Sequence, residues 1–125
     1  MKIALIAHDG KKADLVSFVL QNRELFQHSE LFTTATTGRH MEQAGLTVNK
    51  VLSGPQGGDA QIAAMVATRQ LDVVIFFRDP LDKHPHEPDV QMLMRICDVH
   101  NVPLATNLAA AKLILKGLKF DAQKK

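Results

Sequence analysis

Ser53-Gly54-Pro55-Gln56-Gly57-Gly58-Asp59 is the stretch from which the fold of this chain can be worked out. It joins an apolar run that ends at Leu52 to residues 60–67, which have a helical pattern. Three glycines in seven residues allow positive φ angles and a close approach of the backbone to a ligand, and the start of a helix presents unpaired N–H groups. The stretch therefore predicts a strand-to-helix turn that can bind an anion.

Asp59, the last residue of this stretch, allows two interpretations. Aspartate is among the best N-cap residues, so Asp59 could simply cap the helix that follows. Alternatively, its carboxylate could lie beside the anion site and transfer a proton. The stretch alone leaves both interpretations open.

The pattern of apolar runs predicts an α/β fold. Residues 2–7 and 73–77 are compact runs typical of strands buried on both faces, and shorter runs occur at residues 31–32, 48–52 and 103–105. Helical patterns follow at residues 15–20, 39–44, 59–67, 90–100 and 109–116, and three prolines exclude a helix through residues 78–89. We therefore expect a three-layer αβα sandwich with a five-stranded parallel doubly wound sheet, forming a single domain over residues 1–125.

Size and composition exclude several classes of protein. The chain has 125 residues, of which 46% are hydrophobic and 22% charged, as in ordinary globular domains. A net charge of +2 without a basic stripe gives no indication of binding to nucleic acid or to a membrane. The single cysteine excludes a disulfide or a thiolate metal site within one chain, and no apolar stretch has the length of a signal peptide or a membrane span. A cytoplasmic protein is expected.

Polar residues gather in the turns that follow the predicted strands. In a parallel sheet these turns lie at one edge, where ligands bind. The turns are His8-Asp9, a threonine-rich turn at residues 33–38, Ser53-Gly54, the loop at residues 79–89 and Thr106-Asn107. This distribution indicates a binding or catalytic site at the carboxyl edge of the sheet.

Three groups at this edge could bind phosphate. The threonine-rich turn supplies hydroxyl and N–H groups at a helix start, Ser53-Gly54 supplies a second set, and Lys12 supplies a cation. Each could also be structural, as a helix cap or a solvated lysine. Neither G-x-G-x-x-G nor G-x-x-x-x-G-K-[ST] is present, so we expect the phosphate to belong to a small metabolite rather than a nucleotide.

A metal site is one alternative for the loop after residue 78. His84 and His86, together with Asp79 and Asp89, are residue types that bind zinc or manganese. Pro85 separates the two histidines in a rigid segment, and nothing in the sequence directs both toward one ion.

Acid–base chemistry is the other possibility for these groups. An imidazole can polarise a carbonyl group while a carboxylate removes a carbon-bound proton. Four carboxylates, from Asp9, Asp59, Asp79 and Asp89, are expected at the same edge, and mutual repulsion would raise the pKa of at least one of them.

A series of motifs then matches a known family over almost the whole chain. The motifs, in order, are Ile6-Ala7-His8-Asp9 with Lys11-Lys12, Ala35-Thr36-Thr37-Gly38, residues 53–59, Phe77-Arg78-Asp79-Pro80-Leu81, Pro85-His86-Glu87-Pro88-Asp89-Val90 and Pro103-Leu104-Ala105-Thr106-Asn107. In these motifs the sequence resembles the methylglyoxal synthases. The longest motif, at residues 53–59, and the motif around His86 are the most specific.

The resemblance implies a lyase that needs neither metal nor cofactor and converts dihydroxyacetone phosphate to methylglyoxal and inorganic phosphate. It implies that Asp59 is the catalytic base and that His86 contacts the substrate oxygens and moves protons along the enediolate. It also implies a homohexamer that is inhibited by phosphate. The further residues that it implies are His8, Lys12, Thr34, Ala35, Thr36, Thr37, Ser53 and Gly54 as contacts to the substrate and its phosphate, and Asp9, Asp79 and Asp89 as supporting acidic groups.

One position departs from the family pattern. Methylglyoxal synthases often carry Thr-Gly-Thr-Thr-Gly in the threonine-rich turn, and Ala35 replaces the first glycine here. Because alanine rarely adopts a positive φ, either this turn keeps a negative φ or its donors are displaced.

Two other functions compete with the synthase. Related domains of larger carbamoyl-phosphate-synthesising enzymes bind small effectors without catalysis, so this chain could be a regulatory domain of the same fold. It could also be a metal-dependent phosphohydrolase.

Overall fold

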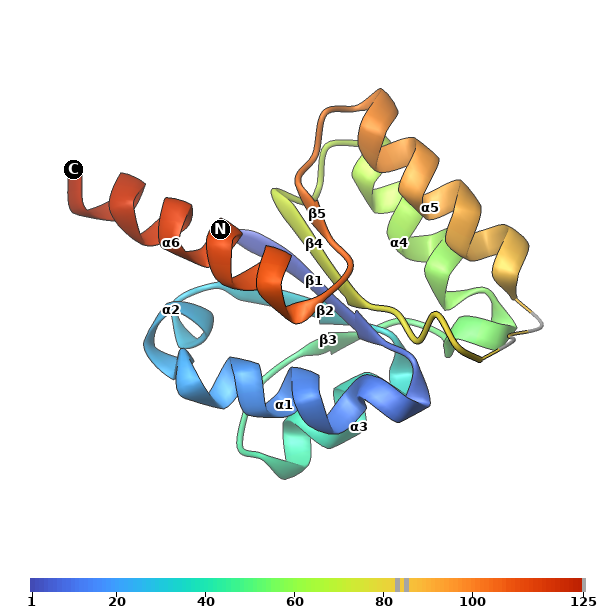
Figure 1. Ribbon diagram of the computed structural model, residues 1–125, viewed down its shortest axis with the longest axis horizontal. Coiled ribbons are helices and arrows are strands. Elements are labelled where there is room, and N and C mark those ends of the chain that lie inside the picture. Colours follow the sequence, from blue (N-terminus) through green and yellow to red (C-terminus); the bar gives the residue numbers. More distant parts are fainter. Residues whose placement is uncertain (83, 85, 125) are drawn as a thin grey trace.

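The computed structural model describes residues 1–82, 84 and 86–124, and its strands form one parallel sheet (Figure 1). The strands are β1 (Lys2–Ala7), β2 (Glu30–Thr33), β3 (Asn49–Lys50), β4 (Val73–Phe77) and β5 (Leu104–Ala105). Their order is β3-β2-β1-β4-β5, and every pair of neighbours is parallel. β1 lies at the centre, pairing Leu5 with Thr33 on one side and with Ile75 on the other.

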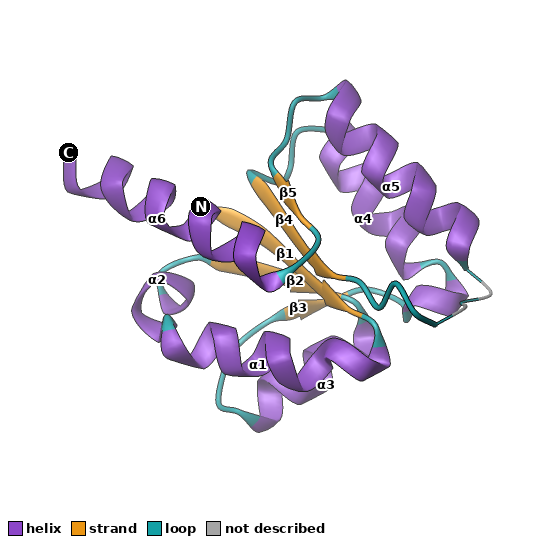
Figure 2. Cartoon of the chain, viewed as in Figure 1, coloured by secondary structure: helices purple, strands orange, loops and turns teal. Residues whose placement is uncertain are grey.

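Helices cover both faces of this sheet (Figure 2). They are α1 (Lys12–Gln21), α2 (Arg23–Gln27), α3 (Ala35–Gln43), α4 (Gly58–Ala67), α5 (Glu87–Val99) and α6 (Leu108–Lys124), with 3-10 turns η1 (Asp9–Lys11) and η2 (Gly54–Gln56). α1, α3 and α6 lie on one face, and α4 and α5 pack together on the other (Figure 1). The expected three-layer αβα sandwich with a five-stranded parallel doubly wound sheet is therefore confirmed.

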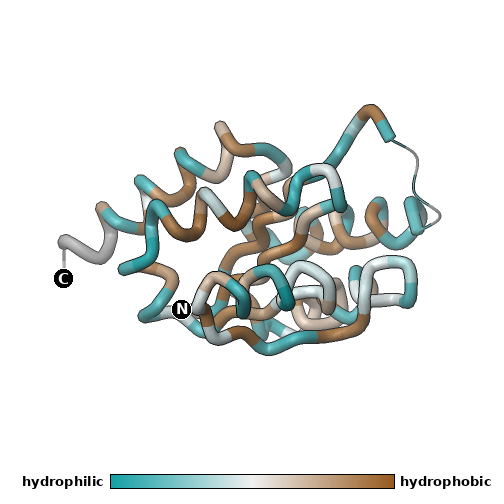
Figure 3. The backbone as a smooth tube through the Cα atoms, turned by 90° about the horizontal axis from the view of Figure 1, so that it is seen from below, coloured by the Kyte–Doolittle hydropathy of each residue, from teal (hydrophilic) through white to brown (hydrophobic). Residues whose placement is uncertain are grey.

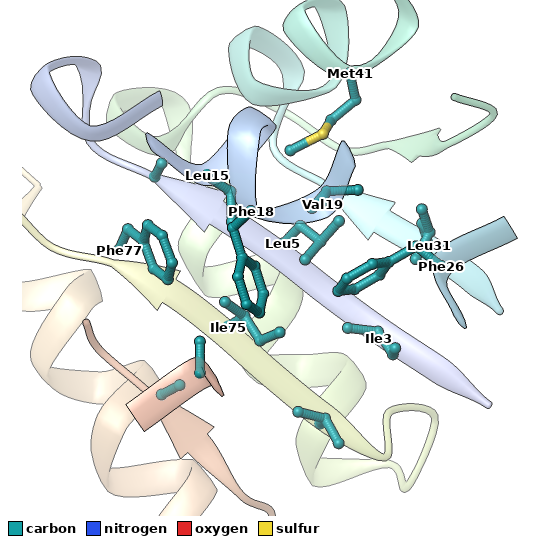
Figure 4. Packing of buried hydrophobic residues seen from close by; sticks show 14 of the residues in the cluster. Ile3, Leu5, Leu15, Phe18, Val19, Phe26, Leu31, Met41, Ile75 and Phe77 are labelled. Carbon is teal, nitrogen blue, oxygen red and sulfur yellow. The ribbon is translucent and has the colours of Figure 1, made fainter. Parts of the chain in front are cut away.

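Successive residues of β1 enter different cores, because side chains alternate between the faces of a strand. Ile3 and Leu5 pack against α1 and α2, where Phe18 and Phe26 are buried (Figure 4). Ile6 belongs to the second core, together with buried residues of α4 and α5. The central strands are accordingly hydrophobic in Figure 3, whereas hydrophobic and hydrophilic residues alternate along the helices. Burial on both faces explains why β1 and β4 lack polar interruptions.

Several element boundaries differ from those predicted. α3 begins at Ala35 rather than residue 39, so the threonines form the first turn of the helix. α5 begins at Glu87 inside the segment predicted to be irregular, because Pro88 occupies the first turn, where its missing N–H costs nothing. The helix α2 was not predicted, β3 is shorter than expected and α6 is longer. Lys83 and Pro85 lie outside the described residues, and so does the predicted rigid segment at Pro85.

The turn at residues 53–59 is shaped by two adjacent glycines. Gly57 is the N-cap of α4 and has φ +104°, which favours glycine. A Cβ on Gly58 would overlap the carbonyl oxygen of Leu52 and lie 2.9 Å from that of Ser53. The N–H of Gly58 donates to the Ser53 carbonyl at 2.8 Å. Asp59 follows Gly58 directly, so this tight packing fixes the backbone from which its side chain extends.

Within the described part of the chain, none of the helices has the length and apolar character needed to span a lipid bilayer.

Gly58→Ala should destabilise the protein by about 3 kcal/mol, because the added Cβ meets backbone atoms, which cannot move aside as a flexible side chain could. Denaturant unfolding followed by circular dichroism measures this loss.

Gly117→Ala in α6 is the matched control, since a Cβ there meets no described atom within 4 Å. This change should raise the free energy of unfolding by about 0.5–1 kcal/mol, through the higher helix propensity of alanine. Equal effects of the two substitutions would contradict the proposed role of Gly58.

Candidate active site

A cavity of about 420 Å³ opens at the carboxyl edge of the sheet, next to the ends of β1, β2 and β4. Its wall combines apolar strand residues with polar residues from four separate turns. The lining residues are Ile6, Ala7, His8, Asp9, Lys12, Thr34, Thr36, Ser53, Gly54, Pro55, Asp59, Phe76, Asp82, His84 and His86. The parallel sheet therefore brings the predicted turns together at one place.

Asp59 lies in the first turn of α4 and is 0% exposed. It does not cap the helix, because Gly57 holds the N-cap position and no side-chain capping bond is formed there. Neither carboxylate oxygen accepts a hydrogen bond from a residue that the structure describes. Burial raises the pKa of Asp59, the charge of Asp89 raises it further, and His86 opposes the rise. The carboxylate is thus kept without donors, as a proton acceptor requires.

This cause differs from the predicted one. Repulsion among four crowded carboxylates was expected to raise a pKa, but burial is the main cause for Asp59, and the charge of Asp89 makes a smaller contribution. Asp9 behaves in the opposite way, because its hydrogen bond and charge interaction with Lys12 lower its pKa.

His86 is the side chain that pairs with Asp59. It lies at the N-cap position of α5, and its Nε2 is 3.4 Å from Oδ2 of Asp59. The absence of a side chain at Gly54 permits this proximity, because a Cβ there would be 3.0 Å from the same Nε2. The Nδ1 atom of His86 is buried and has no hydrogen-bond partner among the described residues. The pair can exchange a proton and can also contact a bound molecule.

His8 is held as a neutral hydrogen-bond donor. Its Nδ1 accepts the backbone N–H of Asp79 at 2.9 Å, so the proton of the neutral ring is on Nε2. Nε2 is buried and finds no acceptor within residues 1–82, 84 and 86–124. Burial and the nearby charges of His84 and His86 lower the pKa of His8 from 6.5 to about 4. At neutral pH the ring therefore offers an N–H from the cavity wall.

Lys12 places a positive charge in the cavity wall although it is only 8% exposed. Its ammonium donates to the Ala7 carbonyl at 2.8 Å and to the Asp9 carboxylate at 2.7 Å. The Asp9 side chain is 96% exposed, so this ion pair is open to water on one side. An ammonium has three N–H bonds, and the third is available to a bound anion.

The amino-terminal turn of α3 supplies further donors to the cavity. Thr34 is its N-cap and Thr36 lies in the first turn, and both line the cavity. Residues in a first helical turn have N–H groups without intrahelical acceptors, and the helix dipole favours an anion there. Ala35 begins the helix without a positive φ. Of the two alternatives given for this residue, a turn that keeps a negative φ is therefore the observed one.

Nine of the predicted site residues line the cavity, and four do not. The nine are His8, Asp9, Lys12, Thr34, Thr36, Ser53, Gly54, Asp59 and His86. Ala35 and Thr37 lie behind the lining residues of α3, and Thr37 is buried and accepts a hydrogen bond from Thr34. Asp79 contributes its backbone N–H to His8 rather than its carboxylate, and Asp89 acts on Asp59 only through its charge. The roles of all these residues stay predictions.

Sequence reasoning considered His84 as a possible metal ligand or acid–base group and assigned no role to Asp82, yet both line the cavity. The spacing of His84 and His86 was visible, but the loop conformation that brings His84 against His8 has no local signature.

The geometry argues against the metal set that was considered as an alternative. One nitrogen from each of His8, His84 and His86 lies within 4.8 Å of the other two, whereas Asp79 and Asp89 do not join this group among the described residues. Coordination through Nε2 of His8 would move its proton to Nδ1, which already accepts the N–H of Asp79. The histidines are therefore better placed to donate hydrogen bonds to an oxyanion than to bind a cation.

Comparisons with known proteins agree with these features. Residues 14–106 match the MGS-like domain family. The chain is 60% identical over 119 residues to the methylglyoxal synthase of Carboxydothermus hydrogenoformans, covering 94% of this chain and 98% of that protein. It is 57% identical over 120 residues to the methylglyoxal synthase of Bacillus anthracis, covering 95% and 92% of the two chains.

A solved structure is similar as well. The crystal structure of methylglyoxal synthase from Elizabethkingia anophelis superposes with a TM-score of 0.86 at 46% sequence identity, covering 91% of this chain and 76% of that one. Because the relatives match over nearly the whole chain and are named as synthases, the regulatory-domain alternative is not favoured. The chain belongs to the methylglyoxal synthase family.

Proposed function

We propose that this chain converts dihydroxyacetone phosphate to methylglyoxal and inorganic phosphate without a metal or a cofactor. The observation that carries this proposal is the Asp59 carboxylate, which is fully buried and accepts no hydrogen bond from a described residue, yet faces a cavity with cationic and N–H donor groups. A pocket built only to bind an anion would avoid such a carboxylate, because like charges repel. The methylglyoxal synthases among its relatives support the same reaction.

In the first step Asp59 removes a proton from the hydroxymethyl carbon of the substrate. The electron pair moves to the carbonyl oxygen, and an enediolate forms. A raised carboxylate pKa makes Asp59 a stronger base than an exposed aspartate, and the N–H at Nε2 of His8 can stabilise the new oxyanion. The neutral His8 donor does not have to give up its proton for this role.

In the second step phosphate is eliminated. The hydroxyl group of the former hydroxymethyl carbon loses its proton and becomes the aldehyde, the double bond moves toward the phosphate-bearing carbon, and the C–O bond to phosphate breaks. His86 is placed to take that hydroxyl proton, since it lies beside both Asp59 and the cavity. The resulting enolate, whose oxygen is still an oxyanion, then takes a proton on its terminal carbon and becomes methylglyoxal.

The phosphate end of the substrate is assigned to the remaining donors of the cavity. Lys12, the first turn of α3 and the Ser53-Gly54 turn line the cavity together and suit a phosphate dianion. Holding the phosphate sets the angle between its C–O bond and the plane of the enediolate, and elimination needs these to be nearly perpendicular.

The remaining properties rest on the family resemblance. Inorganic phosphate, which is the second product, is proposed to inhibit by occupying the donors that hold the substrate phosphate. A homohexamer and a cytoplasmic location are likewise proposed from the family.

Asp59→Asn should lower kcat by about a hundredfold or more, the usual size of general-base catalysis, while the KM changes little. Methylglyoxal release from dihydroxyacetone phosphate measures the effect. The matched control is Asp98→Asn, which changes an exposed aspartate near the C-terminal end of α5 and should leave the activity at the wild-type level. Near-normal turnover by Asp59→Asn would disprove the assignment of the base.

The identity of the products separates a synthase from a phosphohydrolase. We expect methylglyoxal and phosphate in equal amounts, no dihydroxyacetone, and an unchanged rate after treatment with EDTA. Release of dihydroxyacetone with loss of activity in the chelator would instead identify a metal-dependent phosphohydrolase.

Asp59→Asn should also stabilise the protein, by about 1 kcal/mol at pH 7, because it removes a buried charge. Since the pKa of Asp59 is raised in the folded state, its ionised form destabilises the fold above that pKa, and the penalty vanishes below the ordinary value of 3.8. The difference in unfolding free energy between variant and wild type should therefore disappear as the pH falls through this range. A variant that is less stable at pH 7 would contradict the inferred desolvation of Asp59.

A further inference from the structure

The imidazole of His84 stacks on the imidazole of His8. The two ring centroids are 3.6 Å apart and the ring planes differ by 18°. The backbone of His84 is tied to the start of α5, because its carbonyl accepts the N–H of Glu87 at 3.2 Å. The stack thus joins the loop before α5 to the turn after β1.

This stack completes the set of contacts that orient His8. The backbone N–H of Asp79 holds the ring at Nδ1, and Phe76 meets it edge to face with centroids 5.1 Å apart. His84 adds a third contact by covering one face of the ring. Because the N–H of His8 must point at one oxygen of the substrate, small rotations of the ring matter.

The same stack opposes protonation of His8. Two stacked imidazoles cannot both carry a positive charge without strong repulsion, and exclusion of water from a ring disfavours its charged form. Both effects lower the pKa of His8, burial being the larger and His84 the next. The other charged groups that act on His8 are His86 and Glu87 from the start of α5, Arg78 after β4 and Asp9 after β1.

We propose that His84 is a positioning residue, whose stacked ring orients the His8 imidazole and keeps it in the neutral form that donates to the substrate oxygen. The role in catalysis rests on the proposed function, but the effect on His8 does not. Nothing in the proposed chemistry requires His84 to exchange a proton, so the proposed effect on His8 depends on the flat ring of His84 and not on its nitrogen atoms.

Three variants test this proposal. His84→Ala removes the ring, His84→Phe keeps a flat ring of similar shape without charge or N–H, and His28→Ala changes an exposed histidine in another part of the fold. Thermal unfolding establishes that each variant is folded. The protonation of His8 is then followed by NMR as a function of pH, and methylglyoxal release is followed over the same range.

In His84→Ala the titration of His8 should move up from about 4 toward the ordinary value of 6.5, whereas His84→Phe and His28→Ala should keep it low. The kcat of His84→Ala should fall about tenfold at pH 7.5, because the His8 ring loses its orientation. At pH 5.5 the ratio of wild-type to variant kcat should grow by up to about tenfold more, because His8 of the variant is then mostly protonated. His84→Phe should recover most of both losses.

An unchanged His8 titration in folded His84→Ala would overturn the proposal. So would a His84→Phe variant that loses as much as His84→Ala, because the polar nitrogen rather than the ring would then be required. If neither the wild type nor any variant releases methylglyoxal, the proposed function fails, and the titration of His8 still decides whether His84 positions that ring.

Discussion

A buried carboxylate without a hydrogen-bond donor among the described residues is the constraint on which the site depends. Asp59 is kept in this state by the backbone of the preceding turn, where Gly58 packs against the Leu52 carbonyl with no room for a side chain. Removing a carboxylate from water is unfavourable, so the fold must supply stability elsewhere. The two cores, on opposite faces of the sheet, supply it and leave the carboxyl edge free for polar groups.

The cavity around this carboxylate combines two different electrostatic environments. Lys12 and the start of α3 provide fixed positive potential, which suits an anion. The histidines contribute N–H groups, and His8 among them stays neutral at pH 7 because its pKa is about 4. A neutral donor would stabilise a developing oxyanion without attracting the proton that Asp59 is proposed to remove. In the proposed reaction, one small cavity thus both binds a dianion and accepts a proton.

Much of this arrangement could be predicted from local patterns. The apolar runs of β1 and β4 are predicted with their observed bounds, because strands buried on both faces admit no polar residue. The glycines before Asp59 correctly indicated a turn with a positive φ, which Gly57 adopts, whereas the packing of Gly58 against other backbone atoms was not predicted. The boundaries of α3 and α5 were wrong, since threonines and a proline are poor in helix interiors but well tolerated in a first turn.

By itself, the sequence determined the alternation of strands and helices along the chain apart from α2, the parallel sheet and the edge at which its polar turns meet, because these follow from periodicity and connection rules. Only the tertiary structure decided which of those polar residues lie in the cavity. Asp79 and Asp89 carry the same carboxylate as Asp59, yet only Asp59 is both buried and part of the lining. The role proposed for His84 likewise depends on the fold, which stacks its ring on that of His8, seventy-six positions away. Burial, charge and ring contacts depend on groups far apart in the chain, and no local pattern encodes them.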